Sequence, residues 1–386
     1  MKTITTTDDL AAFCTKARQY PYVTVDTEFL RERTYYSKLC LVQLAVPDTD
    51  EDSAVLVDPL AGEGLSLAPL YELFRDTSVV KVFHAARQDL EIFHVDAGVI
   101  PAPLFDTQVA AMVCGFGEQA GYETLVKKIA KTSVDKSSRF TDWSRRPLSD
   151  AQKSYALADV THLRGIYEHL ARKLQNTGRA GWVDEELSVL TDPETYRADP
   201  QEAWRRVKTR NTAPRFLAIV RELARFREEH AQSRDIPRSR IYKDDALVEL
   251  AATKPQSVQD LGRSRLLLRE ARKGEIAEGI LTAVRAGLDC PEADLPMPDR
   301  TLDRQQVNPA LADLLRVLLK ARSDTYDVAS KLIASAADLD AIAGGARDVS
   351  ALRGWRRDVF GGDALRLCEG EIGLAVRGKV VKPVEL

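Results

Sequence analysis

The sequence contains few cysteines, and they lie far apart. Their total of five is odd, and no two of them form a Cys-x-x-Cys pair. A disulfide framework requires paired cysteines, and a structural zinc site requires closely spaced ligands, so the sequence predicts neither. We expect reduced thiols that pack as small hydrophobic side chains at Cys14, Cys40, Cys114, Cys290 and Cys368.

A long apolar run is also missing. No stretch approaches the roughly 20 apolar residues that a helix needs to span a bilayer. The first ten residues have neither the apolar centre of a secretory signal nor the Arg-rich pattern of a transit peptide. We therefore expect a cytoplasmic protein with no membrane association.

An excess of charge of one sign is absent as well, because the net charge is only −3. A polyanionic partner would have to be bound by a local patch rather than by the chain as a whole. What the chain does have is length. Its 386 residues exceed the size at which one hydrophobic core usually stops growing, so we expect two or three domains.

The first part of the chain has the pattern of an α/β domain. Short apolar, β-branched runs predict strands at 22–29, 39–46, 54–58 and 79–84, and a helix is expected at 67–76. The first three strands follow one another with no room for helices, which predicts an antiparallel meander; later strands should be added by crossover. The expected result is a mixed sheet flanked by helices.

A long helix is expected after this sheet, and only helices after that. Ser149 and Gln152 form a capping-box pattern that opens a helix from Asp150 to roughly Leu174, which Asn176-Thr177-Gly178 should end. A proline-containing linker follows at about 192–200. Beyond it the hydrophobic periodicity is helical to the C-terminus, which predicts an all-α second half.

An internal repeat is visible in this helical half. Six residues recur with a shift of 92 positions and keep the apolar positions in register, which predicts two small helical modules of similar build. Asp235, Ile236, Ile241, Leu247, Leu250 and Ala251 correspond to Asp327, Val328, Ile333, Leu339, Ile342 and Ala343.

Two carboxylates stand on the first predicted strand. Asp26 and Glu28 are two residues apart, so strand periodicity puts both on one face, about 6.6 Å apart along the chain. An ordinary solvent-facing strand surface would explain the pair. Acidic residues are poor strand formers, however, and the flanking valines mark a strong strand. A divalent cation would offset the two negative charges.

Three further residues can join this pair. Tyr155 and Asp159 are one helical turn apart on the long helix, so their phenol and carboxylate project from one face, although this spacing also occurs by chance. Asp89 lies in an early turn of the helix after the strand that ends at His84, where the helix dipole alone favours an acid. Together the four carboxylates can form a cage of hard oxygen ligands for two Mg²⁺ or Mn²⁺ ions.

Such a cage suits the in-line hydrolysis of a phosphodiester. Two ions about 3.5–4 Å apart can clamp the attacking water and the leaving 3′-oxygen. We expect Asp26 to touch both ions. Glu28 and Asp159 should hold the ion that activates water, and Asp89 should support the other ion. Tyr155 is a poor base at an ordinary pKa of about 10, so its predicted role is a hydrogen bond that aims the water.

These residues and their neighbours resemble the DEDD exonuclease superfamily, tyrosine subclass, and in particular the ribonuclease D family. The resemblance implies a ribonuclease H-like fold for the first domain. It also implies a two-metal 3′→5′ exoribonuclease that releases nucleoside 5′-monophosphates and trims 3′ extensions from transfer RNA precursors. We expect the chain to act as a monomer. Four segments carry the resemblance: Asp26-Thr27-Glu28-Phe29, His84 to Leu90, Phe105-Asp106-Thr107-Gln108, and Asp142 to Leu148 leading to Tyr155 and Asp159.

The resemblance extends to the helical half. The segment from Trp204 to about Cys290 resembles an HRDC domain, and the region from Asn308 resembles a second, more divergent copy. Whether that second copy binds nucleic acid is left open by its poor fit. The expected boundaries are an exonuclease domain at 1–175, a linker at 176–202, an HRDC domain at 203–290, a linker at 291–307 and an HRDC-like module at 308–386.

Local basic patches indicate where RNA could bind. Residues 201–241 contain eleven Lys or Arg and five acids, an excess that can neutralise phosphates. The same residues could form a solvated helix face with ion pairs such as Arg225–Glu229. In the first domain, Phe29 could stack beneath a terminal base. Four basic residues precede the Tyr155 helix and could flank the scissile phosphate: Lys136, Arg139, Arg145 and Arg146.

Two motifs are discounted, and two other functions are kept. The run from Gly115 to Gly121 has the wrong spacing for a dinucleotide loop and follows a helical run. His162 and His169 are expected on a helix face, not as metal ligands.

A DNA 3′→5′ exonuclease would use the same carboxylates, but proofreading domains lack the tandem helical half. An RNA-binding scaffold without catalysis would lack a carboxylate, and none is missing.

Overall fold

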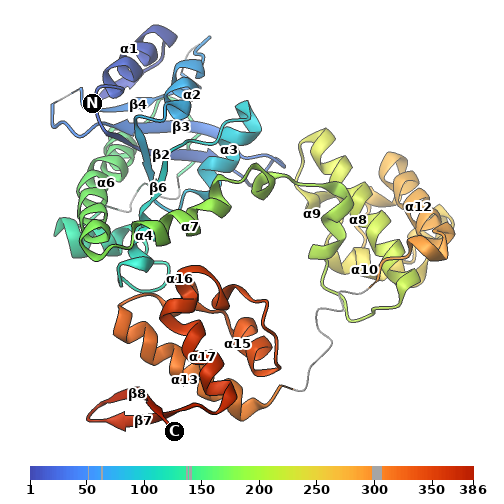
Figure 1. The fold of residues 1–386 in the computed structure, drawn as a ribbon. Helices are drawn as coiled ribbons and strands as arrows, with labels where there is room; N and C mark the ends of the chain where they lie inside the picture. Colours follow the sequence, from blue (N-terminus) through green and yellow to red (C-terminus); the bar gives the residue numbers. More distant parts are fainter. Residues whose placement is uncertain (51, 62–63, 136–137, 139–140, 298–306) are drawn as a thin grey trace. The chain divides into compact units, whose positions relative to one another are not determined.

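The computed structural model describes residues 1–50, 52–61, 64–135, 138, 141–297 and 307–386. The chain divides into two compact units, each built from segments that are distant in sequence (Figure 1). The first unit consists of Met1–Glu28, Cys40–Thr195 and Leu302–Leu386, and the second of Phe29–Leu39 and Tyr196–Thr301.

A six-stranded mixed sheet forms the centre of the first unit, with strand order β1-β4-β3-β2-β5-β6. β3 and β4 are antiparallel, whereas β1–β4, β2–β5 and β5–β6 are parallel pairs. The expected mixed sheet is confirmed. β1 and β6 were not predicted, because three residues are too few for a periodic signal. The strands are β1 Lys2–Ile4, β2 Tyr22–Leu30, β3 Lys38–Ala45, β4 Ala54–Val57, β5 Val80–Phe83 and β6 Leu104–Asp106.

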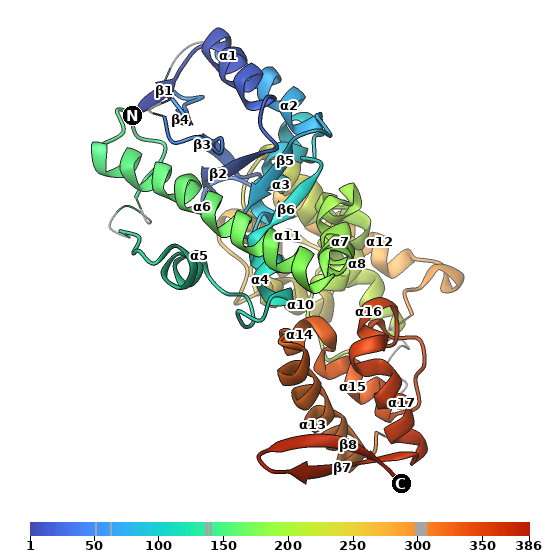
Figure 2. The same ribbon diagram turned by 60° about the vertical axis from the view of Figure 1, so that its left-hand side comes forward.

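Helices cover both faces of the sheet (Figure 2). Helix α2 (Ala68–Arg75) and helix α3 (Arg87–Ala97) lie on one face, where the rings of Phe74, Phe83 and Phe93 contact one another. Helix α1 (Thr7–Ala17) packs against α2. On the opposite face, Val82 of β5 packs against helix α6 (Asp150–Thr177). β2 is therefore enclosed between α3 and α6.

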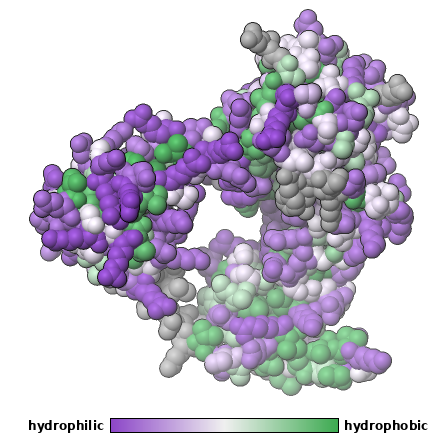
Figure 3. Space-filling model, turned by 180° about the vertical axis from the view of Figure 1, so that it is seen from behind, coloured by the Kyte–Doolittle hydropathy of each residue, from purple (hydrophilic) through white to green (hydrophobic). Residues whose placement is uncertain are grey.

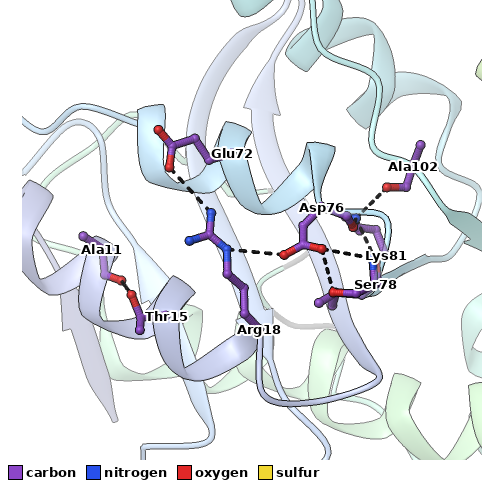
Figure 4. A network of polar contacts seen from close by, with 9 residues as sticks. Ala11, Thr15, Arg18, Glu72, Asp76, Ser78, Lys81 and Ala102 are labelled. Carbon is purple, nitrogen blue, oxygen red and sulfur yellow. Dashed lines mark hydrogen bonds and ion pairs between the residues drawn. The ribbon is translucent and has the colours of Figure 1, made fainter.

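A buried lysine links the loop that leads into β5 to the loop that leads into β6 (Figure 4). Lys81 is fully buried, and its ammonium nitrogen donates to the carbonyl oxygens of Val79 at 2.7 Å, of Ala102 at 2.6 Å and of Asp76. Each of the three ammonium hydrogens thus has an acceptor. Arg18, which caps the C-terminus of α1, pairs with the carboxylate of Asp76 and so joins α1 to the same loop.

The segment expected as a linker at 176–202 is largely helical. Helix α7 (Ala180–Thr191) is followed by short 3₁₀ turns at Pro193–Tyr196 and Pro200–Arg206. Val183 and Leu187 of α7 are buried in one cluster with residues of helix α4 (Thr107–Val113). The prolines mark only the end of α7, which explains why they suggested an irregular segment.

The C-terminal part of the first unit is a helical module with a terminal hairpin. The hairpin contradicts the expectation of an all-α second half. Gly378 sits in its two-residue turn at φ +68°, a conformation that glycine adopts without strain. Figure 3 shows hydrophobic side chains gathered there, where Val376 is 71% exposed. The elements are α13 Pro309–Tyr326, α14 Ser330–Ile333, α15 Ala336–Ala343, α16 Gly354–Arg356, α17 Gly362–Glu369, β7 Ile372–Arg377 and β8 Val380–Glu385.

This C-terminal module is attached to α7 and α4. The rings of Trp182 and Trp355 are stacked, with centroids 4.5 Å apart and planes inclined by 10°. Arg356 forms ion pairs with Glu185 and Glu186 of α7. The attachment therefore combines an aromatic stack with partly buried charge pairs.

The second unit is built around helices α8 and α12. Gly287 of α12 lies against the backbone of Ile219 in α8, and an added Cβ would be only 2.5 Å from the Ile219 Cα. The two helices therefore pack closely because residue 287 has no side chain. The helices are α8 Pro214–Arg234, α9 Arg238–Ile241, α10 Asp244–Thr253, α11 Val258–Leu261 and α12 Gly274–Asp289.

The two helical modules share an order of elements. Each begins with a long helix that has proline at its first position and ends in a left-handed aspartate, Asp235 at φ +47° and Asp327 at φ +50°. A four-residue helix and a longer helix then follow in both, and later a left-handed glycine opens the next helix, at Gly274 and Gly354. The sequence repeat thus corresponds to a repeat of structure.

The connection between β2 and β3 belongs to the second unit. The backbone N–H groups of Tyr35 and Tyr36 both donate to Asp235 at 3.0 Å. The Tyr35 hydroxyl donates to Glu228 of α8, a carboxylate that is only 1% exposed, and accepts from Gln232. The tip of this connection is therefore anchored to the helix that forms the core of the first helical module.

Two expectations about the whole chain concern cysteines and membranes. All five cysteines are unpaired, and four of them are buried. Within the part of the chain that the structure describes, no helix combines the length and the apolar character needed to cross a membrane.

Candidate active site

β2 presents its even-numbered residues to α6. The Tyr22 hydroxyl donates to Glu168 at 2.7 Å, and the Thr24 hydroxyl oxygen lies 2.9 Å from the carbonyl oxygen of Val160. Because side chains alternate along a strand, Asp26 and Glu28 lie on this same face. The contacts of Tyr22 and Thr24 thus fix the position of α6 along the strand that carries both carboxylates.

Asp159 of α6 completes a cluster of three carboxylates. One oxygen each of Asp26, Glu28 and Asp159 can be chosen so that all three lie within 4.8 Å of one another. Among the described residues this is the only group with the spacing of a metal site. His162 and His169, on the same helix as Asp159, are not part of it.

Two features place Asp159. The expected capping box is confirmed: Ser149 and Gln152 exchange side-chain and backbone hydrogen bonds at the start of α6. The helical turn that contains Asp159 is also held by Tyr122, because the Tyr122 hydroxyl lies 2.6 Å from the carbonyl oxygen of Asp159. Tyr122 was not predicted as a site residue. A single tyrosine in the short helix α5 (Tyr122–Leu125) forms no recognisable pattern.

A pocket of about 260 Å³ adjoins the carboxylates. Tyr155 lines it together with Asp26 and Asp159, as the helical spacing predicted. Its wall also includes Gly121, the end of the glycine-containing run discounted as a dinucleotide loop. The remaining lining residues are Val25, His84, Tyr122, Glu123, Thr124, Val134 and Leu163.

Burial and mutual repulsion perturb the carboxylates. Burial raises the pKa of Asp26 well above its ordinary value, and the negative charge of Asp159 raises it further. A cation bound between them would offset both effects. The donor set consists of carboxylate oxygens alone, which suits a hard divalent ion such as Mg²⁺ or Mn²⁺. The residues present therefore fit a divalent metal site.

Asp89 approaches β2 from the other face. It lies in the first turn of α3, where it is 6% exposed, and accepts a hydrogen bond from the Thr27 hydroxyl. Burial raises its pKa, and the charge of Asp26 adds to this rise. Asp89 is thus close enough to Asp26 to affect its charge, but it lies outside the three-carboxylate cluster.

Tyr155 is held as a protonated hydroxyl. Burial raises its pKa above the ordinary value, and the charges of Asp159, Glu28 and Asp26 raise it further. A phenol with a raised pKa remains a hydrogen-bond donor at neutral pH. The ring centroid of Trp143 lies 6.1 Å from that of Tyr155 and supports it from one side.

Arg146 has a structural role. Its guanidinium donates to the carbonyl oxygen of Trp143 at 2.7 Å, to that of Cys40 at 2.7 Å and to the carboxylate of Asp58 at 2.6 Å. The Arg146–Asp58 ion pair is largely buried, with side chains 19% and 4% exposed. The suggested phosphate contact by Arg146 is therefore wrong. Arg146 instead fixes the loop that carries Trp143.

The other predicted RNA contacts stay predictions. The Arg145 side chain is 84% exposed and lies 3.4 Å from Asp142, outside the pocket lining. Phe29 follows Glu28 on β2 and is partly exposed. Lys136 and Arg139 lie outside the described residues.

Comparison with known proteins agrees with this site. The 3'-5' exonuclease family matches residues 1–175, and the HRDC domain family matches residues 216–284. Ribonuclease D of Jannaschia sp. (strain CCS1) is 63% identical over 384 residues, which cover 100% of this chain and 99% of that protein. Ribonuclease D of Granulibacter bethesdensis is 51% identical, with 98% and 95% coverage.

A solved structure extends the agreement to the fold. The crystal structure of Escherichia coli RNase D, described as an exoribonuclease involved in structured RNA processing, superposes with a TM-score of 0.82 at 29% identity. The match covers 96% of this chain and 98% of that one. The chain therefore belongs to the ribonuclease D family and is a metal-dependent 3′→5′ exoribonuclease.

Proposed function

We propose that this enzyme trims the 3′ extensions of transfer RNA precursors in the cytoplasm, as a monomer, with two divalent metal ions held by Asp26, Glu28, Asp89 and Asp159. The observation that carries the proposal is the cluster of three carboxylates, two of which, Asp26 and Asp159, line one pocket together with Tyr155. We further propose Mg²⁺ as the preferred ion, because the ligands are hard oxygens and Mg²⁺ is commonly held by carboxylates together with substrate phosphates.

The metal supplies the electrostatic part of the reaction. When bound, divalent ions lower the pKa of the attacking water and offset the charge that develops on the phosphate. The protein's own residues supply position. Asp26 would help to hold both ions, Glu28 and Asp159 would hold one, and Asp89, which approaches β2 from its other face, would support the other.

Tyr155 contributes a hydrogen bond rather than a proton transfer. Its raised pKa keeps the phenol protonated, so it can donate to the attacking oxygen but cannot act as a base at neutral pH. Trp143, fixed through Arg146, limits the positions that the Tyr155 ring can take.

The direct test uses a transfer RNA precursor with a 3′ extension of several nucleotides and Mg²⁺. Nucleoside 5′-monophosphates should be released in order from the 3′ end until the mature end is reached. Tyr155→Phe should lower kcat about 100-fold or more, the range for a lost positioning or proton-transfer group, with little change in melting temperature. Equal rates on a single-stranded RNA of unrelated sequence would contradict the preference for transfer RNA, although not the exonuclease activity.

The first helical module is proposed as an RNA-binding surface. Most basic residues of its 201–241 segment are paired with acids, for example Arg227 with Asp244 and Arg238 with Glu228, and the expected Arg225–Glu229 pair is present at 3.7 Å. Four exposed basic residues have no acidic partner in the described part of the chain and remain for phosphates: Arg206, Lys208, Arg210 and Arg240. The second module is proposed as an HRDC-like copy that attaches to α7.

A further inference from the structure

His84 directly follows β5 and lines the same pocket as Asp26 and Asp159. Its Nδ1 atom lies 3.0 Å from the hydroxyl oxygen of Thr107. The Thr107 hydroxyl has one hydrogen, and it is donated to the carbonyl oxygen of Phe83 at 3.0 Å. The Thr107 oxygen must therefore accept from His84, which places the ring hydrogen on Nδ1.

The other ring nitrogen follows from this assignment. A neutral imidazole carries one hydrogen, so Nε2 has a lone pair and acts as an acceptor. Burial lowers the pKa of His84, which keeps the ring neutral. Within the described residues, Nε2 has no hydrogen-bond partner. The pocket therefore offers one neutral acceptor besides its carboxylates.

The chemistry of RNA limits which donor can meet this acceptor. Base amino and imino groups differ among the four bases, and an exonuclease that removes successive nucleotides must accept all of them. Phosphate oxygens carry no hydrogen. The ribose 2′-hydroxyl is present on every nucleotide, is a donor, and is what distinguishes RNA from DNA.

We propose that His84 Nε2 accepts a hydrogen bond from a ribose 2′-hydroxyl beside the scissile phosphate, and that Thr107 and the Phe83 carbonyl fix the ring for this task. His84 is then a specificity residue that favours RNA over DNA. This inference rests on the proposed active site, because it needs the substrate to occupy the pocket lined by Asp26 and Tyr155.

The test is a cycle of enzyme and substrate changes. Three RNAs each lack a single 2′-hydroxyl, at the last, second-last or third-last nucleotide. The value of kcat/KM is measured on these and on the all-ribose RNA, for the wild type, for His84→Ala and for the control His169→Ala, which changes an exposed histidine of α6.

One position should show coupling. There the wild type and His169→Ala should lose about three- to tenfold in kcat/KM when the 2′-hydroxyl is removed, the value of one neutral hydrogen bond. His84→Ala should lose a similar factor on all-ribose RNA and nothing further on the deoxy substrate. His84→Gln, whose amide oxygen can occupy the place of Nε2, should recover part of the discrimination.

Thr107→Val tests the orientation of the ring separately. Valine keeps the shape but cannot accept from Nδ1, so the hydrogen is free to move to Nε2 and the discrimination should fall without a change of His84 itself. This variant also shows whether any loss depends on the ring's fixed hydrogen rather than on its size.

Two results overturn the inference. If His84→Ala slows hydrolysis equally on ribose and deoxyribose substrates at all three positions, His84 does not read the 2′-hydroxyl. If the wild type shows no preference at any position, there is nothing for His84 to read. In both cases metal-dependent hydrolysis that is lost in Asp26→Asn would leave the proposed function intact. If the wild type releases no nucleotides, the proposed function and this inference both fail.

Discussion

Asp26, Glu28 and Asp159 repel one another as long as no cation lies between them. The raised pKa of Asp26 expresses this cost, because the buried carboxylate resists ionisation. A raised carboxyl pKa in the folded state contributes stability below the unfolded pKa of about 4 and removes it as pH rises through the folded pKa. The contribution of Asp26 to the stability of the metal-free protein should therefore be smaller at pH 8 than at pH 5.

Asp26→Asn should separate stability from function. Removing one buried like charge should raise the melting temperature in EDTA at pH 8. The further rise in melting temperature that Mg²⁺ causes in the wild type should be mostly abolished. Activity should fall by about 100-fold or more, because bound ions supply several kcal/mol of transition-state stabilisation. Thermal unfolding with EDTA or Mg²⁺ measures the first two effects. The control Asp184→Asn, an exposed carboxylate on α7, should respond to Mg²⁺ as the wild type does. An undiminished Mg²⁺ response in Asp26→Asn would contradict the metal assignment.

Lys81→Met should destabilise the exonuclease domain. Methionine fills a similar volume but removes a donor from three carbonyl oxygens, of which only that of Asp76 keeps another among the described residues, the Val79 N–H at 3.4 Å; each buried unsatisfied group costs about 1–3 kcal/mol. We expect a loss of about 3 kcal/mol or more in the free energy of unfolding, measured by urea denaturation. Lys2→Met, on the exposed edge strand β1, should change it little. Equal stability of the two variants would show that water replaces the ammonium.

At the residue scale, sequence reasoning found the carboxylates and Tyr155 but not their surroundings. The convergence of Asp26, Glu28 and Asp159 could be predicted because the periodicity of a strand or helix shows which side chains share a face. The position of Asp89 on the other face of β2 depends on how α3 packs, and no local pattern encodes that. Lys81 reads as a surface residue in the sequence, because its acceptors are carbonyl groups that every residue has.

At the element scale, close helix contact in the second unit depends on one missing side chain. Gly287→Ala should force α8 and α12 apart, since the new methyl would meet the Ile219 backbone, and we expect a loss of about 1–3 kcal/mol as for other overpacked cores. Gly165→Ala is the matched control: it also lies inside a helix, but nothing surrounds its Cβ position within 4 Å. This change should stabilise the protein by about 0.5–1 kcal/mol.

Denaturation curves of both glycine variants decide the point. If Gly287→Ala is as stable as Gly165→Ala, α8 and α12 are not in the tight contact described here. Far-UV circular dichroism should be unchanged in both, since neither substitution disfavours a helix.

Elements with strong local signals were predicted well, and those that depend on partners were not. The long strand β2 and the capped helix α6 appear where the sequence placed them. α7 was hidden by the prolines that follow it, and it is stabilised by burial against α4. The β7–β8 hairpin follows directly on a helix, and its alternating valines are too few to stand out from helical periodicity.

For the whole molecule, RNA binding should depend on both units. Replacing the unpaired basic residues of the first helical module, in Arg206→Gln, Lys208→Gln, Arg210→Gln and Arg240→Gln together, should raise KM with little change in kcat. The slope of log affinity against log salt should fall by about 0.7 for each lost phosphate contact with single-stranded RNA. Filter binding at several salt concentrations measures the slope.

The control replaces basic residues that already have acidic partners at the surface, Arg234→Gln and Arg263→Gln. Those variants should leave the salt slope unchanged. If the fourfold variant also leaves it unchanged, the first module does not contact phosphates and RNA is held by the exonuclease domain alone.

The anchored β2–β3 connection bears on how such a protein can be rearranged in evolution or in the laboratory. Tyr35 and Tyr36 come from the exonuclease domain by sequence, yet their hydrogen-bond partners Glu228 and Asp235 lie 193 to 200 residues later. An exonuclease domain cut off at residue 195 would retain this connection, which follows soon after Glu28 in the chain. It would lose Glu228 and Asp235, the two carboxylates that hold the connection in place. The helical module is therefore not an interchangeable appendage: a replacement from another protein would need its own carboxylates at these two places.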